Sequence, residues 1–226
     1  MKATVVVFPG SNADAEMVHT LRDLVGMSTA VAWHKDTDLE ATDLIAVPGG
    51  FSYGDYLRCG AIARVSPIMP AIRQHAERGG YLIGVCNGFQ ILTEAGILPG
   101  ALTRNRHLRF ECRDIFVKKQ AEGPFTRGVP EVLRLPIAHA EGRYQADEAT
   151  LHRLESENLV AFRYCDVHGN ITDAANPNGS QGSIAGIYGG PRRNVLGLMP
   201  HPERMSEAAI GGADGRQLFD ALLSSA

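Results

Sequence analysis

One cysteine lies in a sequence context that could support nucleophilic chemistry. Segment 81–90 reads Tyr-Leu-Ile-Gly-Val-Cys-Asn-Gly-Phe-Gln, so an apolar run leads into Gly-x-Cys-x-Gly centred on Cys86. Glycines on both sides permit a sharp turn from a strand into a helix, which is the geometry of a nucleophile elbow. A sulfur at the start of a helix also meets the positive end of the helix dipole, which favours the thiolate. The alternative is that Cys86 is only a small buried hydrophobic residue.

A thiolate nucleophile needs a base, and the base needs a group that orients it. Segment 199–204 reads Met-Pro-His-Pro-Glu-Arg and follows an apolar run at 195–199, so His201 is predicted at the end of a strand. The flanking prolines favour extended backbone, in which residues two apart face the same side. Glu203 can therefore orient the imidazole of His201 and stabilise its protonated form. The alternative is a solvated histidine and glutamate in a proline-rich turn.

The oxyanion that forms during acyl transfer is commonly bound by backbone N–H groups. The N–H group of Asn87 directly follows the candidate nucleophile and is one natural donor. Turn 48–51 (Pro-Gly-Gly-Phe) ends an apolar run at 44–47, and the N–H group of Gly50 could be the second donor. The alternative for 48–51 is an ordinary glycine turn.

The elements that would position these groups alternate between strands and helices in the first half of the chain. Apolar runs predict strands at 4–8, 29–33, 44–47 and 81–85. Amphipathic stretches predict a helix up to about 25, a second at 62–78 that is interrupted near Pro67 and Pro70, and a third from 88 to 95. This alternation predicts an α/β fold with a doubly wound, mostly parallel sheet and flanking helices.

The second half is less regular and predicts a small antiparallel extension of the sheet. Strands or apolar runs are predicted at 110–118, 133–138, 159–164, 183–187 and 195–199, before a last helix at 214–223. No linker or shift in composition marks a boundary, so we expect residues 1–226 to form a single domain.

Composition limits the classes of partner. The 226 residues include 22 basic and 25 acidic side chains, and the resulting net charge of −3 argues against nucleic acid or an anionic membrane. No apolar run has the length of a membrane span, and no signal peptide is recognisable, so we expect a cytoplasmic protein. The cysteines and histidines show no metal-ligand spacing, so we predict free thiols and no metal site.

These motifs resemble a known enzyme family. Gly-x-Cys-x-Gly-x-Gln with a distant His-Pro-Glu is similar to the class I, triad-type glutamine amidotransferases, which have a flavodoxin-like fold. Across nearly the whole chain the pattern resembles the glutaminase subunits of phosphoribosylformylglycinamidine synthase. The segments that carry this resemblance are 8–12, 48–60, 84–90, 139–142 and 199–204, of which 48–60 is the most specific. Residues 106–110 read Arg-His-Leu-Arg-Phe and depart from the Ser-Gly-Arg-Phe of the fused enzymes.

The resemblance implies hydrolysis of L-glutamine to glutamate and ammonia. Cys86 would attack the side-chain amide carbon, and the N–H groups of Gly50 and Asn87 would bind the oxyanion. His201 would protonate the departing ammonia and then activate water, while Glu203 would orient His201.

Three further residues are expected to bind the substrate on the same resemblance, namely Gln90, Phe51 and His139. Gln90 lies one helical turn beyond Cys86, and its alternative is an ordinary helix residue. His139 could instead contact a partner or serve only the structure.

The resemblance also implies that the ammonia is used by other chains. Proteins of that family work with a large synthetase subunit and a small accessory subunit. The synthetase uses ATP and Mg to convert formylglycinamide ribonucleotide to the amidine in de novo purine biosynthesis. No cofactor is expected in this subunit, because the sequence has no Walker-type phosphate loop.

Three other functions stay open at this stage. The glutaminase could serve a different acceptor, as in pyridoxal phosphate synthase. The chain could be a relative of the intracellular-protease type, although those proteins often carry histidine at the position of Asn87. It could also be a binding or regulatory module in which Cys86 is chemically inert.

Overall fold

The computed structural model describes residues 1–39 and 41–225, and five parallel strands form one half of its central sheet. In sheet order these are β2 (Ser28–Trp33), β1 (Lys2–Val7), β3 (Leu44–Val47), β4 (Tyr81–Val85) and β11 (Val195–Leu198). The carboxyl ends of β3, β4 and β11 therefore meet at one edge of the sheet. Ligands of α/β proteins bind at this edge.

Four antiparallel strands continue the same sheet beyond β11. They are β10 (Ile184–Gly189), β9 (Val160–Cys165), β6 (Glu111–Lys119) and β7 (Val132–His139), which gives nine strands in all. A separate two-stranded sheet pairs β5 (Ala101–Thr103) with β8 (Arg143–Gln145). The predicted α/β class, with a parallel sheet and an antiparallel extension, is confirmed.

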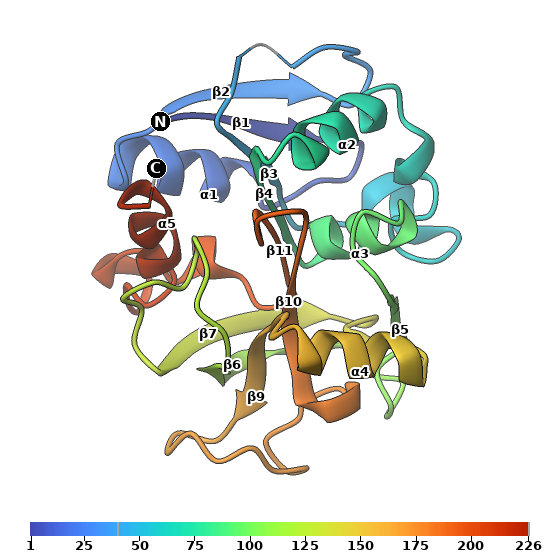
Figure 1. Cartoon of the computed structure of the whole chain (residues 1–226), viewed down its shortest axis with the longest axis vertical. Coiled ribbons are helices and arrows are strands. Elements are labelled where there is room, and N and C mark those ends of the chain that lie inside the picture. The colour runs from blue at the N-terminus through green and yellow to red at the C-terminus, as the bar shows by residue number, and fades with distance from the viewer. Residues whose placement is uncertain (40, 226) are drawn as a thin grey trace.

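Helices flank the central sheet. They are α1 (Asp14–His19), which continues into a π-helical segment at Thr20–Leu24, α2 (Met69–Glu77), α3 (Asn87–Glu94), α4 (Glu148–Ser156) and α5 (Arg216–Leu223). Figure 1 shows α1 and α5 on one side of the central strands and α2 and α3 on the other, while α4 lies beside the antiparallel half. The two termini lie near each other beside α1 and α5.

The interruption predicted near Pro67 and Pro70 is confirmed, whereas one helix was not predicted. Within 62–78 a short 3-10 turn at Ala63–Val65 comes first, and α2 begins only at Met69. Ser66 is extended because it precedes Pro67, and Pro70 can only occupy the first turn of a helix. Helix α4 was not predicted, because only Leu154 of its nine residues is buried and the apolar pattern is weak.

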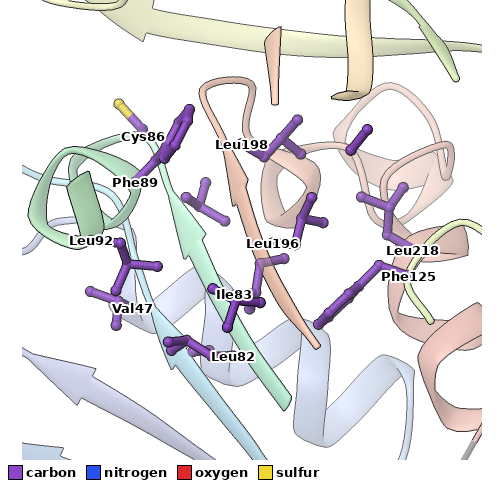
Figure 2. Close-up of a cluster of buried hydrophobic side chains, with 14 of the residues drawn as sticks. Val47, Leu82, Ile83, Cys86, Phe89, Leu92, Phe125, Leu196, Leu198 and Leu218 are labelled. Atoms are coloured by element: carbon purple, nitrogen blue, oxygen red, sulfur yellow. The ribbon is translucent and has the colours of Figure 1, made fainter. Parts of the chain in front are cut away.

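Burial explains why the central strands carry unbroken apolar runs. Every residue of β3 and β11 is buried, as are the last four residues of β4, because helices cover both faces of the sheet. Figure 2 shows Leu82 and Ile83 on β4 beside Leu196 and Leu198 on β11, with Cys86 at the upper end of β4. The candidate nucleophile therefore lies at the edge of the buried hydrophobic core.

Both glycines that flank Cys86 are required by packing. A Cβ atom on Gly88 would lie 2.0 Å from the carbonyl oxygen of Val47, and one on Gly84 would lie 2.7 Å from a methyl carbon of Leu92. The start of α3 therefore lies directly against the end of β3, which brings the turn after β3 close to Cys86.

Gly88→Ala should lower the free energy of unfolding by about 3 kcal/mol, because the new methyl group meets backbone that cannot rotate away. Urea denaturation measures this. Gly96→Ala is the control, since its Cβ would meet open space at φ 65° and should cost only about 1 kcal/mol. Equal losses for the two variants would contradict the packing argument.

Candidate active site

Cys86 lies at the sharp turn between β4 and α3 that the sequence predicts. Its backbone has φ 50° and ψ −105°, a conformation that costs a residue other than glycine about 1–3 kcal/mol. The N–H group of Cys86 donates to the carbonyl of Leu198 over 2.8 Å, so the strained residue stays tied to β11. Its side chain is almost fully buried and the sulfur lies 3.7 Å from the carbonyl oxygen of Ala138.

His201 and Glu203 form a buried pair just after β11. The imidazole Nδ1 donates to Oε1 of Glu203 over 2.5 Å, and the two side chains are 2% and 0% exposed. The N–H group of His201 donates to the carbonyl of Pro136 on β7 over 2.9 Å, which fixes the backbone. The two side chains meet as predicted, but the extended backbone predicted for them is wrong, because Pro202–Arg204 form a 3-10 turn.

The side chains of His201 and Cys86 both lie against Gly49. A Cβ atom on Gly49 would lie 2.5 Å from Cε1 of His201 and 3.5 Å from Cβ of Cys86, so both side chains pack on this glycine. Nε2 of His201 is buried and lacks a well-aligned hydrogen-bond partner among the described residues. Cys86 is near enough to act on the charge of the imidazole.

The environment of His201 favours its protonated form. Burial lowers the pKa of the imidazole, but the negative charges of Glu203 and of the Cys86 thiolate outweigh burial and raise the pKa from 6.5 to about 10. The imidazole thus lies between the side chains of Glu203 and Cys86. This arrangement suits a cysteine nucleophile with a nearby proton donor.

The turn after β3 directs alternate N–H groups toward α3. The N–H groups of Phe51 and Tyr53 donate to the carbonyls of segment 9–10 over 2.8 and 2.7 Å. Gly50 forms an antiparallel bridge with Ser11 in which its two neighbours make the hydrogen bonds, so its own N–H group points away from segment 9–12. That of Ser52 reaches a side chain in the first turn of α3.

Neither of the two expected oxyanion donors has an acceptor among the described residues. Asn87 is the first residue of α3, where N–H groups have no partner within the helix. Gly50 has φ 156°, and a Cβ atom there would lie 2.5 Å from the carbonyl oxygen of Gly10. This position therefore requires glycine, and its N–H group is free to bind an anion.

Two of the three expected substrate-binding residues lie at different depths. Gln90 is buried, its Nε2 donates to the carbonyl of Glu141 over 2.6 Å, and its Oε1 accepts from Asn87 over 2.9 Å. Phe51 is 44% exposed and stacks on Phe110, with ring centroids 6.5 Å apart. Gln90 thus lies in the wall and Phe51 at the rim.

The third, His139, is a buried neutral imidazole at the end of β7. Burial and the nearby positive charge of His201 lower its pKa to about 3. Its Nδ1 lies 3.2 Å from Oδ1 of Asn105, and its Nε2 is buried without a partner in the described chain. When Nδ1–H donates to that amide oxygen, Nε2 becomes a buried acceptor that faces no protein donor.

Asn105 fixes the position of His139 and of the loop after β7, and the sequence did not indicate it. Its side chain is fully buried, donates to the carbonyls of Arg109 and His139, and accepts from the N–H group of Gly142. Segment 103–110 reads as an exposed basic loop, so no local pattern marks a buried asparagine there.

A cavity of about 340 Å³ opens beside the pair formed by His201 and Glu203. Its lining includes Ala138, His201, Arg204 and Arg134. Within residues 1–39 and 41–225, no cluster of three or more histidine, cysteine or acidic side chains could hold a metal ion. In the same part of the chain, no helix is long and apolar enough to cross a membrane.

A family model for the CobB/CobQ-like glutamine amidotransferase domain matches residues 1–212. The chain belongs to this family. Among curated relatives, phosphoribosylformylglycinamidine synthase subunit PurQ of Gloeobacter violaceus is 55% identical, covering 100% of this chain and 98% of the relative. The same subunit of Bradyrhizobium diazoefficiens is 54% identical over 98% of this chain and 97% of its own.

Solved structures share the fold of this chain. The structure of PurLQS from Thermotoga maritima contains a chain that superposes with a TM-score of 0.86 at 40% identity, covering 99% of this chain and 97% of that one. A glutamine amidotransferase from the same organism matches with a TM-score of 0.63 at 15% identity, over 99% and 96% of the two chains, which shows the fold alone.

Glu203→Gln should lower the pKa of His201, because the neutral amide no longer stabilises the imidazolium. NMR titration of the His201 ring nitrogens measures this. Because folding raises the pKa of His201, protonation of this imidazole stabilises the folded state fully below about pH 6.5. This contribution to stability is lost as the pH rises toward 10. The wild type should therefore lose stability over that range, and Glu203→Gln should lose less. Identical titrations of His201 in the two proteins would contradict the assigned pairing.

Proposed function

We propose that this amidotransferase is the glutamine-hydrolysing subunit of a phosphoribosylformylglycinamidine synthase. The observation that carries the proposal is the strained Cys86 beside the buried pair of His201 and Glu203, with two unpaired N–H groups near the sulfur. Similarity over the full length to subunits of that name, at 54–55% identity in the two relatives described, supports the choice of pathway.

The first half-reaction would form a thioester. The Cys86 thiolate attacks the amide carbon of the glutamine side chain, and the C=O π electrons move to oxygen. The N–H groups of Gly50 and Asn87 bind this oxyanion. Neither N–H group has another acceptor among the described residues. When the intermediate collapses, the C–N bond breaks and the imidazolium of His201 gives its proton to the leaving nitrogen, which departs as ammonia.

The second half-reaction would release glutamate. The imidazole of His201, now neutral, takes a proton from water as the water oxygen attacks the thioester carbonyl. The C–S bond breaks, and its electron pair returns to the sulfur of Cys86. Glu203 holds the ring in one orientation throughout, through the 2.5 Å hydrogen bond to Nδ1.

Substrate binding is proposed for the three residues expected from the sequence. Nε2 of His139 is a buried acceptor that an N–H group of glutamine could meet. Gln90 keeps one N–H and one lone pair after its two protein bonds. Phe51 would cover the mouth of the site, where it stacks on Phe110.

Exposed apolar side chains border the site and support a covering partner. Tyr56 and Leu57, which follow the turn that contains Gly50, are 88% and 65% exposed. Leu108, in the loop before β6, is 74% exposed. We assign this covering role to the large synthetase subunit, with the small accessory subunit in the same complex. The synthetase would use the ammonia with ATP and Mg, and this subunit would need no cofactor.

Two further parts of the proposal concern organisation. Buried hydrophobic side chains from both halves of the chain form one cluster, which supports a single domain over 1–226. The cytoplasmic location stays a prediction.

A glutamine-like electrophile, such as a diazoketone analogue, should label Cys86 at one equivalent per chain, because only this thiol combines an elbow with a neighbouring imidazolium. Peptide mass spectrometry locates the label, with Cys112→Ser as the control for exposed thiols. Cys86→Ala should lower glutamine hydrolysis by at least about 10⁴-fold. Labelling of another cysteine in the wild type would contradict the proposal.

Glutamine hydrolysis should rise when the purified synthetase and accessory subunits are added, because the exposed rim around the site would then be covered. Release of glutamate is measured with and without formylglycinamide ribonucleotide and ATP. A chain whose turnover is the same in the presence and absence of these partners would not be this subunit, and stimulation by another synthetase would identify a different acceptor.

A further inference from the structure

A chain of three hydrogen bonds joins separate walls of the site through the side chain of Asn87. The N–H group of Ser52 donates to Oδ1 of Asn87 over 3.1 Å. Nδ2 of Asn87 donates to Oε1 of Gln90 over 2.9 Å, and Nε2 of Gln90 donates to the carbonyl of Glu141 over 2.6 Å. Each amide accepts through oxygen and donates through nitrogen, so the bonds fix one orientation for both side chains.

The members of this chain are shielded from water. Ser52, Asn87 and Gln90 are 3%, 1% and 4% exposed. Without the amide oxygen of Asn87, the buried N–H group of Ser52 would have no acceptor, and an unpaired buried donor costs about 1–3 kcal/mol. The turn would therefore have to move to satisfy this group.

The turn that donates this hydrogen bond is strained. Tyr53 and Asp55 have φ of 55° and 52°, which residues other than glycine rarely adopt without outside restraint. On one side, Phe51 and Tyr53 are tied to segment 9–10. On the side that faces α3, the hydrogen bond from the N–H group of Ser52 to Asn87 holds the backbone of the turn, two residues after Gly50.

We propose that the side chain of Asn87 is a positioning group that holds turn 50–53 against the nucleophile elbow. It thereby aims the N–H group of Gly50 at the place where the oxyanion forms, while its own N–H group is the other donor. This inference rests on the proposed glutaminase function, because it assigns Asn87 a role in stabilising the intermediate of that reaction.

The test compares Asn87→Leu with Thr93→Val. Leucine has nearly the size of asparagine but makes neither hydrogen bond. Thr93→Val removes another buried hydrogen bond from α3, the one from Oγ1 to the carbonyl of Gln90, without touching the turn. For each protein, kcat for glutamine hydrolysis and the rate of Cys86 alkylation by iodoacetamide are measured. Alkylation needs the thiolate but forms no oxyanion.

Asn87→Leu should lower kcat by about 100-fold, since a misplaced donor of this kind has that effect. Its alkylation rate should change by no more than about threefold, because the thiolate and its imidazolium remain. Thr93→Val should leave both quantities within about threefold of the wild type. Circular dichroism checks folding, and Asn87→Ala replaces the leucine variant if that variant does not fold.

Two results would overturn the inference. One is a kcat for Asn87→Leu close to that of the wild type. The other is an equal loss of kcat and of alkylation, which would mean that the nucleophile itself had been disturbed. A wild type that hydrolyses no glutamine, with or without its partners, would overturn the proposed function and this inference together.

Discussion

The pair formed by His201 and Glu203 is the interaction on which the rest of the site depends. Taking a carboxylate and an imidazolium out of water costs several kcal/mol per ion unless they compensate each other. Here the compensation is a 2.5 Å hydrogen bond between nearly inaccessible groups. The surrounding backbone is accordingly fixed. The carbonyl of Glu203 accepts from Thr20 and Ser206.

Sheet order explains how this pair reaches the nucleophile. Strands β3, β4 and β11 are consecutive neighbours in the sheet and run parallel. Their carboxyl ends supply, in that order, the turn with Gly50, the elbow with Cys86 and the segment with His201. Three parts of one reaction therefore come from three adjacent strand ends, and the packed core below holds them at fixed separation.

The antiparallel half completes the site from the other side. Strand β7 supplies the carbonyl of Pro136 that holds His201, and it ends at the neutral imidazole of His139. Asn105 ties the loop before β6 to the loop after β7. The parallel half thus carries the groups proposed to react, and the antiparallel half forms the opposite wall.

The sequence by itself determined the strands of the core, the turn at Cys86 and the nearness of His201 to Glu203, but not the 3-10 turn that brings these two side chains together. The strands and the turn at Cys86 follow from local patterns, such as unbroken apolar runs and the small size of glycine. The tertiary structure alone decided that Cys86 and His201 meet, that Asn87 binds the turn after β3, and that Asn105 is buried. Those contacts join residues far apart in the chain, and their distances depend on strand order and packing, which local patterns do not encode.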